Sequence, residues 1–450
     1  MAAIDEQSLL DLFAQVMPAE RWQELEGEKS RAQIYTLRVV VGMMLVQRLN
    51  ERGTQQEAVH QVTVGSLGRL LGAGKRVREG KISSATGAYA RACGRVSINR
   101  MEKVCDLVLR ELGQHITPEP SLDRAVLLID GTSISLEHSP GLLAGFPPGN
   151  NQYGEGHWGI LKMVAVHEVQ TGIAQRPAWG AMYGPSAVSE QELATRALEQ
   201  APARSVIIGD GNFGIFYYAY AVVESKREAL FRLTKQRAEA LGAGKLRPQG
   251  ETKLCWCPSR YDRMKHPDLP PNAQIEGRLI VVTRKGFREA LYLFTTLTDA
   301  VEKVVALYGQ RWNLELDLRT LKRTLRLYHL RGKSREAVEK ELLIAVVGYG
   351  LVRAFMALAA RRAGLPPRRL SFTRCYGLLN AMVGKLCSTV PEQRKQAFDR
   401  VLAYMGKSKL PNRPHRRAYT RAVWGFKQAF PKRCCPSTGP ASVAPEEKSK

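Results

Sequence analysis

Acidic residues are scarce in this sequence. Asp and Glu number 42 against 67 Lys and Arg, which leaves a formal net charge of +25 on 450 residues. Hydrophobic residues make up 44%, which excludes a disordered chain, and 8 cysteines in a chain of this length exclude a disulfide-stapled miniprotein. The charge excess points to a polyanionic partner, either nucleic acid or an anionic membrane surface. The length predicts two or more domains.

The sequence also lacks a secretory signal and a clear membrane span. It starts MAAIDEQSLLDLF, acidic and polar where a signal peptide is basic and then apolar. The best spanning candidate runs from Leu342 to Ala360, but it contains Arg353 and is flanked by charged segments, so we interpret it as a buried core helix. We therefore expect a cytoplasmic protein with no membrane partner, and nucleic acid as the polyanion.

Several common site motifs are missing as well. There is no serine-nucleophile motif, P-loop or G-x-G-x-x-G fingerprint, and no two cysteines have C-x2-C spacing. Cys255 and Cys257, with His266 nearby, could hold a metal. Zinc sites usually show two spaced ligand pairs, however, so two reduced cysteines on a strand or loop are favoured.

Changes in composition along the chain predict its domains. Residues 1–118 have helical periodicity and a basic connector from Leu67 to Ile82, which modestly favours a DNA-binding domain over a solvated helical face. Residues 119–235 alternate apolar runs and helices, 236–297 form a strand-rich insertion, and 298–364 are helical. A basic C-terminal region covers 365–435, where Lys407 to Arg433 includes nine basic residues and no acidic ones; 436–450 is predicted to be disordered.

Two apolar runs share one pattern, in which branched residues lead to an aspartate and then a glycine. They are VLLID before Gly131 and VIIGD before Gly211. Each predicts a buried strand whose carboxyl end presents Asp130 or Asp210, at the sheet edge where α/β active sites form. The glycine predicts a sharp turn that leaves the carboxylate accessible. A single Asp-Gly pair could merely cap a turn, but the repetition favours a site.

The segment Thr298–Leu330 predicts one long helix. Tyr308, Arg311, Glu315 and Lys322 then fall on a stripe roughly 60° wide, beside a stripe of leucines. An Arg311–Glu315 ladder on a solvated face is the alternative interpretation. Together with the two aspartates, Glu315 would give three carboxylates, which are hard oxygen ligands for Mg²⁺. Two such ions, roughly 4 Å apart, can carry out phosphoryl transfer.

At these residues the chain resembles the DDE transposases of bacterial insertion sequences, in the branch marked by a Tyr-x2-Arg-x3-Glu-x6-Lys signature. The likeness extends over roughly residues 85–350. The signature is matched without a gap and both earlier acidic motifs are present, at Tyr308, Arg311, Glu315, Lys322, Asp130 and Asp210.

The resemblance implies an α/β fold: an RNase H-like core with a five-stranded mixed sheet flanked by helices, a strand-rich insertion, an N-terminal helical domain and a helical, basic C-terminal region. It implies that Asp130, Asp210 and Glu315 bind two Mg²⁺ ions, for which Mn²⁺ can substitute. In some relatives a tryptophan of the insertion stacks on a flipped base; here we interpret Trp256 as a core residue. The residues expected to contact DNA are Tyr308, Arg311, Lys322, Arg319 and Lys333.

The activity implied is cut-and-paste transposition. Hydrolysis at the transposon end frees a 3′-OH, which then attacks target DNA; a hairpin forms between these steps in some relatives, and the sequence leaves this open. The implied partner is double-stranded DNA, held by a homodimer in a synaptic complex at the bacterial nucleoid. Two alternatives are a catalytically silent or host-adapted DNA-binding protein and a metal-dependent nuclease without mobility.

Overall fold

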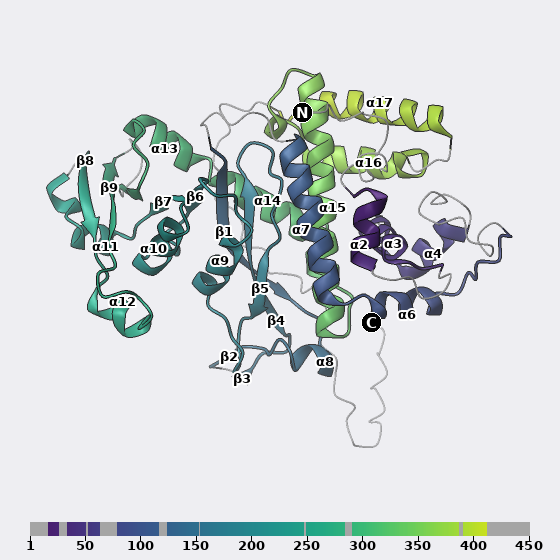
Figure 1. The fold of residues 1–450 in the computed structure, drawn as a ribbon, viewed down its shortest axis with the longest axis horizontal. Helices are drawn as coiled ribbons and strands as arrows, with labels where there is room; N and C mark the ends of the chain where they lie inside the picture. The colour runs from purple at the N-terminus through teal and green to yellow at the C-terminus, as the bar shows by residue number, and fades with distance from the viewer. Residues whose placement is uncertain are drawn as a thin grey trace, which may run out of the picture.

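A computed structural model describes residues 17–26, 34–50, 53–63, 79–116, 124–152, 154–246, 249–283, 290–386 and 390–411. In these residues, helices surround one mixed β-sheet (Figure 1). Most of the basic connector, and the basic tail and C-terminal segment beyond residue 411, lie outside the described residues.

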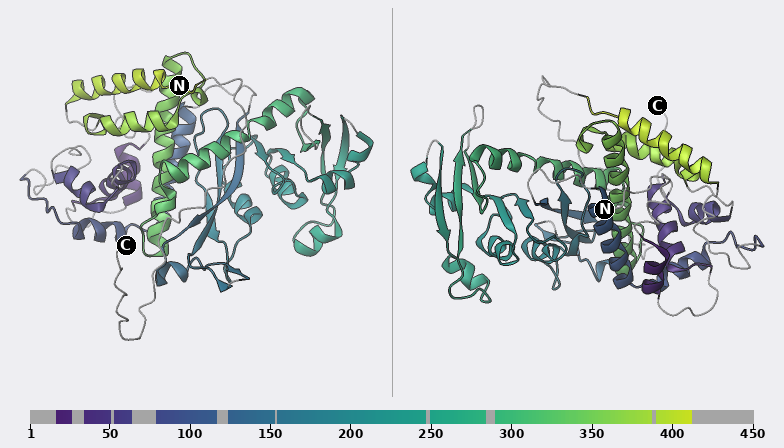
Figure 2. Two further views of the ribbon diagram at one scale, coloured as in Figure 1. Left: turned by 180° about the vertical axis from the view of Figure 1, so that it is seen from behind. Right: turned by 45° about the horizontal axis from the view of Figure 1, so that its top comes forward.

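The N-terminal part of the described chain is helical. Thr36 caps α3 by accepting a hydrogen bond from Val39 N at 3.5 Å. Ser84 precedes a helical stretch in the sequence, which predicts that it caps a helix there. The helix α6 begins instead at Gly87, after Thr86. The longest of these helices, α7, lies alongside α15 (Figures 1 and 2). The bounds are α2 (Ala19–Glu26), α3 (Leu37–Leu49), α4 (Gln55–Thr63), α6 (Gly87–Arg95) and α7 (Ile98–Ile116).

Within the described residues, eight strands form the main sheet, in the order β5-β4-β1-β6-β7-β10-β9-β8. The central strands β1, β6 and β7 are parallel, and the flanking pairs are antiparallel. Strands β10, β9 and β8, which come from the predicted insertion, therefore extend the sheet beyond β7. The strands are β1 (Val126–Ser135), β4 (Ile160–Glu168), β5 (Ala178–Ala181), β6 (Val206–Gly209), β7 (Glu228–Arg232), β8 (Gly250–Trp256), β9 (Ile275–Val282) and β10 (Leu291–Thr295). A small hairpin, β2 (Asn150–Asn151) and β3 (Gly154–Glu155), follows α8 (Pro140–Leu143).

Helices cover both faces of the sheet. Leu127 and Ile129 of β1 pack against α9 (Glu190–Leu198) and α10 (Phe216–Glu224). Val126 and Leu128 point the other way, into the larger cluster that includes α7, α14 (Trp312–Arg323) and α15 (Arg335–Arg362). Because side chains alternate along a strand, β1 is buried on both sides, which explains its unbroken apolar run.

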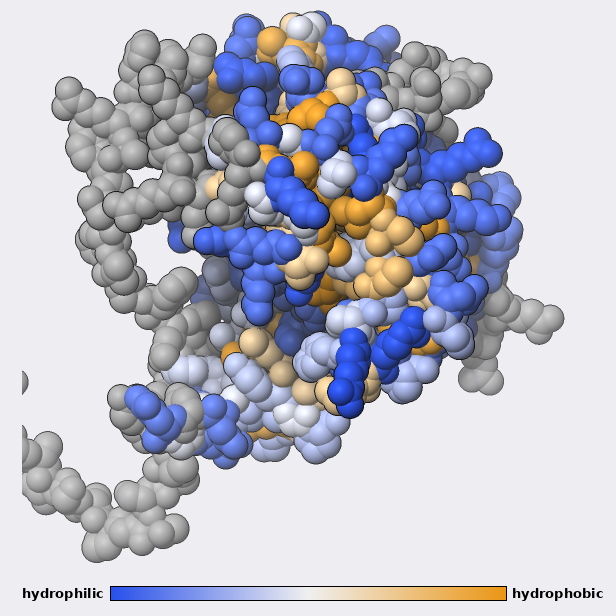
Figure 3. Space-filling model, turned by 90° about the vertical axis from the view of Figure 1, so that its left-hand side faces the viewer, coloured by the Kyte–Doolittle hydropathy of each residue, from blue (hydrophilic) through white to orange (hydrophobic). Residues whose placement is uncertain are grey.

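The insertion contains a strand that we did not predict. The segment from Lys235 to about Pro271 is basic and rich in glycine and proline, which predicts irregular structure. Strand β8 lies there instead, between α11 (Lys235–Ala240) with η1 (Ala243–Leu246) and α12 (Arg260–Lys265). Glu251, Lys253 and Cys255 are exposed on β8, the edge strand. Seen from the β8 end of the sheet, the surface carries many hydrophilic residues around a band of apolar ones (Figure 3).

Trp256, at the end of β8, is a core residue, as we predicted. It is 5% exposed, and its ring packs edge-on against Phe294, with ring centres 4.8 Å apart, and against Phe216. Cys255 and Cys257 are exposed free thiols, and the His266 ring stacks on Tyr217.

Among the described residues, α15 is long and apolar enough to cross a membrane. Its most apolar stretch is entirely buried inside the molecule. It packs against α3, α7, α16 (Phe372–Leu386) and α17 (Pro391–Lys407), as the core-helix interpretation predicts (Figure 1). The approach to α7 is close at Gly350, where an added Cβ would lie 2.6 Å from Leu109 Cδ2. A short η3 (Pro367–Arg369) links α15 to α16.

Candidate active site

Asp130 lies in the middle of β1, not at its end as we expected. Parallel pairing with β6 stops at Leu128, whereas antiparallel pairing with β4 continues to Ser135. Beyond Leu128, therefore, no described strand pairs with β1 on the β6 side. The predicted turn at Gly131 is absent from this described segment, since the strand runs straight through it. Asp210 does follow the last residue of its strand, β6, as predicted.

The two aspartates are close enough for their charges to repel. Burial, and then the charge of Asp210, raises the pKa of Asp130 to about 6, opposed by the Gly131 N–H and Arg311. Gly131 N donates to Asp130 Oδ1 at 2.8 Å, and Asn212 N donates to Asp210 Oδ1 at 2.9 Å. Both carboxylates are thus fixed by backbone donors at the open side of β1.

The signature segment is two helices rather than one. α13 (Val301–Gly309) and α14 are separated at Gln310 and Arg311, and η2 (Leu327–His329) follows α14, so the prediction of one long helix was wrong. The break is slight, because both residues keep right-handed helical dihedrals. Tyr308 and Arg311 stay side by side: burial raises the pKa of Tyr308, and the charge of Arg311 opposes this.

Arg311 connects the signature to β1. Its Nη2 lies 2.7 Å from Glu315 Oε1, and its Nη1 lies 3.9 Å from Asp130 Oδ2. The predicted Arg311–Glu315 pair therefore exists, but Arg311 also faces Asp130, and the side chains of the pair are only 19% and 30% exposed. Glu315 is thus connected to Asp130 through the Arg311 guanidinium. In the described residues, no three Asp, Glu, His or Cys side chains lie close enough together to form a metal site.

The other residues predicted to contact DNA lie on α14 or shortly before α15. Lys322 is half-buried near Asp130: burial lowers its pKa, and the charge of Asp130 opposes this. Arg319 is exposed on α14. Lys333 pairs with Glu137 and lines a cleft of about 620 Å³ between α3, α6 and α15. Other basic residues of that cleft are Arg48, Arg326, Arg331 and Lys340.

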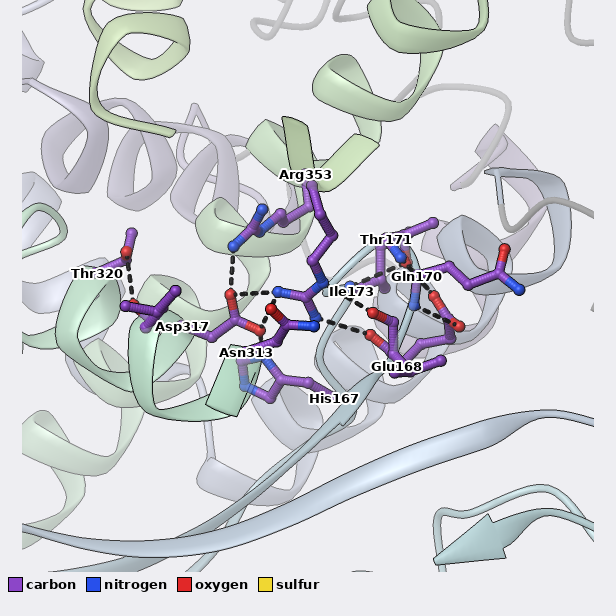
Figure 4. A network of polar contacts seen from close by, with 12 residues as sticks. His167, Glu168, Gln170, Thr171, Ile173, Asn313, Asp317, Thr320 and Arg353 are labelled. Atoms are coloured by element: carbon purple, nitrogen blue, oxygen red, sulfur yellow. Dashed lines mark hydrogen bonds and ion pairs between the residues drawn. The ribbon is translucent and has the colours of Figure 1, made fainter. Parts of the chain in front are cut away.

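A buried ionic network holds α14 in place through Asp317 (Figure 4). Asp317 is 0% exposed and pairs with Arg353 of α15, and Arg368 of η3 places Nη1 2.9 Å from both of its oxygens. His167 Nδ1 of β4 lies 3.3 Å from Asp317 Oδ2. Because Asp317 is two residues from Glu315, this network fixes the helix that carries the glutamate.

The charges in this network decide its protonation. Burial acts to raise the pKa of Asp317, but Arg353 and Arg368 outweigh it and hold that pKa well below its usual range. Burial lowers the pKa of His167, which keeps the imidazole neutral. Arg353 also donates from Nε to Tyr349 Oη at 2.8 Å and lies over the rings of Tyr349 and Phe372.

Sequence reasoning missed three residues at or near the site. Glu190 begins α9 directly after Ser189, which caps the helix by accepting a hydrogen bond from Glu192 N at 3.1 Å. In the sequence, Glu190 is one of two acidic residues in the first turn of a helix, where acidic residues are common. Asp317 is fully buried and Trp312 is 52% exposed beside Arg311, and neither belongs to the Tyr-x2-Arg-x3-Glu-x6-Lys signature.

The comparisons with known proteins agree with the geometry. A family model described as a transposase DDE domain matches residues 121–351, which include both aspartates and the signature. The transposase InsG for insertion sequence element IS4 of Escherichia coli is 31% identical over 326 residues, which cover 70% of this chain and 71% of that protein. A DDE domain implies a polynucleotidyl transferase-type enzyme that acts on DNA, generally with a divalent metal, and the mixed sheet flanked by helices is its RNase H-like fold. The chain therefore belongs to the DDE transposases of insertion sequences.

Proposed function

We propose that this protein cuts DNA at the ends of its insertion sequence and joins the freed 3′-OH to target DNA, by a cut-and-paste route. The observation that carries this proposal is the meeting of Asp130, Asp210 and, through Arg311, Glu315 at the open side of β1. The three come from separate parts of the sequence, and all lie inside the transposase domain.

The donor set fits Mg²⁺, with Mn²⁺ as a substitute. Asp130 is 18% exposed and repelled by Asp210, so the pair presents oxygen atoms whose charge a hard divalent cation would neutralise. Asp130, Asp210 and Glu315 would hold it. When bound, the metal supplies activation of the attacking oxygen and stabilisation of the leaving oxygen.

The cations beside the carboxylates suit a DNA backbone. Arg311 offers a planar fork that matches phosphate oxygens, and Lys322 offers a point charge near Asp130. Tyr308 packs against Arg311 and would support its orientation. Arg319 and Lys333 would extend the contact along the duplex, and the exposed ring of Trp312 could stack on an unpaired base.

The net charge of +25 supports double-stranded DNA as the partner, with a strong dependence on salt. Because two transposon ends must be brought together, we propose that a homodimer forms the synaptic complex. Its place of action would be the cytoplasm, at the nucleoid.

The test uses end DNA taken from the terminal repeats that flank the gene. Asp130→Asn, Asp210→Asn and Glu315→Gln should bind this DNA like the wild type but lose cleavage in Mg²⁺. Glu192→Gln, an exposed glutamate paired with Arg196, is the matched control and should cut normally. Full cleavage by any of the three variants would overturn the proposal. Binding without cleavage by the wild type would favour the DNA-binding alternative, and cleavage without joining would favour the nuclease.

A further inference from the structure

Glu190 places another carboxylate beside the aspartate pair. Burial raises its pKa, the charge of Asp210 raises it further, and Lys162 and the Gly131 N–H act against this. Glu190 in turn contributes to the raised pKa of Asp130. The three carboxylates therefore feel one another's charge, although Glu190 lies on α9 and the others on or after central strands.

Gly131 of β1 leaves room for the Glu190 carboxylate beside Asp130. A Cβ added to Gly131 would lie 1.8 Å from Glu190 Oε1, so the carboxylate occupies the space that any other residue at 131 would fill. Since no described strand pairs with β1 on the β6 side beyond Leu128, the sheet is open where Glu190 reaches Asp130 and Asp210. The glycine after Asp130 is needed for this room rather than for a turn.

The start of α9 is held firmly against the site. Gln191 Nε2 donates to Asn212 O at 3.2 Å, which ties the helix to the Asp210 turn, and Lys162 Nζ donates to Val188 O at 3.0 Å. Lys162 is thus partly engaged with the backbone before α9. A partly buried carboxylate that feels like charges is costly unless a cation offsets them.

We propose that Glu190 is a fourth carboxylate of the metal site, adding an oxygen donor and a negative charge to the cation held by Asp130 and Asp210. This inference rests on the proposed function, because it presumes that the aspartate pair binds a divalent metal. It assigns to Gly131 the role of admitting Glu190.

Calorimetric titration of the full-length protein with Mn²⁺, without DNA, tests this directly. Glu190→Gln, which keeps the shape and removes the charge, should weaken Mn²⁺ binding by roughly tenfold or more. Gly131→Ala should do the same, because the methyl group displaces the flexible end of Glu190 without changing its charge. Glu192→Gln is the matched control on the same helix and should bind like the wild type. Thermal unfolding without metal checks that each variant is folded.

Asp130→Asn separates this inference from the proposed function. If Asp130→Asn loses Mn²⁺ affinity while Glu190→Gln and Gly131→Ala keep it, the inference is wrong and the metal site stands. If Glu190→Gln only lowers the melting temperature, Glu190 merely partners Lys162, and the inference is again wrong. If the wild type binds no Mn²⁺, or Asp130→Asn binds it normally, both the inference and the proposed metal site fall.

Discussion

Asp317→Asn should be among the most destabilising single changes in this protein, although it touches no substrate. The side chain is fully buried and pairs with Arg353 and Arg368, while His167 beside it is neutral. Asparagine fills the same volume but removes the negative charge that Arg353 and Arg368 share. Two guanidinium groups then remain close together, and Arg353 is only 5% exposed. Breaking a buried pair in this way costs about 3–5 kcal/mol.

Equilibrium unfolding of matched variants measures this cost. Asp399→Asn is the control, because its pair with Arg362 is exposed and should contribute about 1 kcal/mol or less. In a double-mutant cycle, Asp317→Asn combined with Arg353→Met should cost less than the sum of the two changes, since the second removes the charge that the first leaves unpaired. A loss below about 1 kcal/mol for Asp317→Asn, or simple additivity, would refute the reasoning.

The pH dependence of the same variant has a definite sign. The folded-state pKa of Asp317 is depressed, so its stabilisation is present above the unfolded pKa of about 4 and is lost as the pH falls below it. The stability difference between wild type and Asp317→Asn should therefore narrow below about pH 4. A difference that stays constant from pH 7 to pH 3 would contradict this assignment.

Further substitutions test single side chains. Arg311→Lys keeps the charge but loses the fork, so end cleavage should fall by roughly 10- to 100-fold with the fold unchanged, measured as the rate in Mg²⁺. Lys322→Met should reduce the slope of log binding constant against log salt by about 1, measured on end DNA. Trp256→Ala should destabilise the insertion by about 3–5 kcal/mol, because its ring is packed in the core. Trp312→Ala should leave stability unchanged and weaken binding to DNA with unpaired bases by about 1–3 kcal/mol.

Where chemistry and spacing coincide, the sequence predicted which side chains the fold brings together. The repeated apolar-Asp-Gly pattern found Asp130 and Asp210, and the signature spacing found Arg311 and Glu315, which lie together as expected. The interpretation of the local backbone was less accurate. The glycine after Asp130 indicated a turn, but β1 continues through it. Because Gly131 has no side chain, the carboxylate of Glu190 can lie against the strand there. Glycine allows both, and only tertiary contacts distinguish them.

Other features depend on partners distant in sequence. Asp317 and Arg353 are ordinary polar residues until the fold buries them against each other. Strand β8 was missed because an exposed edge strand carries alternating polar residues that resemble a loop. The break between α13 and α14 falls at Gln310 and Arg311, which are not helix-breaking residues. Gly309, the last residue of α13, is the nearest local signal.

Joining of a pre-cut transposon end to target DNA tests the central claim most directly. The substrate is an end duplex from the repeats flanking the gene, with either a 3′-OH or a 3′-deoxy terminus, mixed with a target plasmid and Mg²⁺. The account predicts that the wild type joins only the 3′-OH end, and that Asp130→Asn, Asp210→Asn and Glu315→Gln bind the end but join nothing. Joined products from the 3′-deoxy end, or from any of these variants, would contradict it.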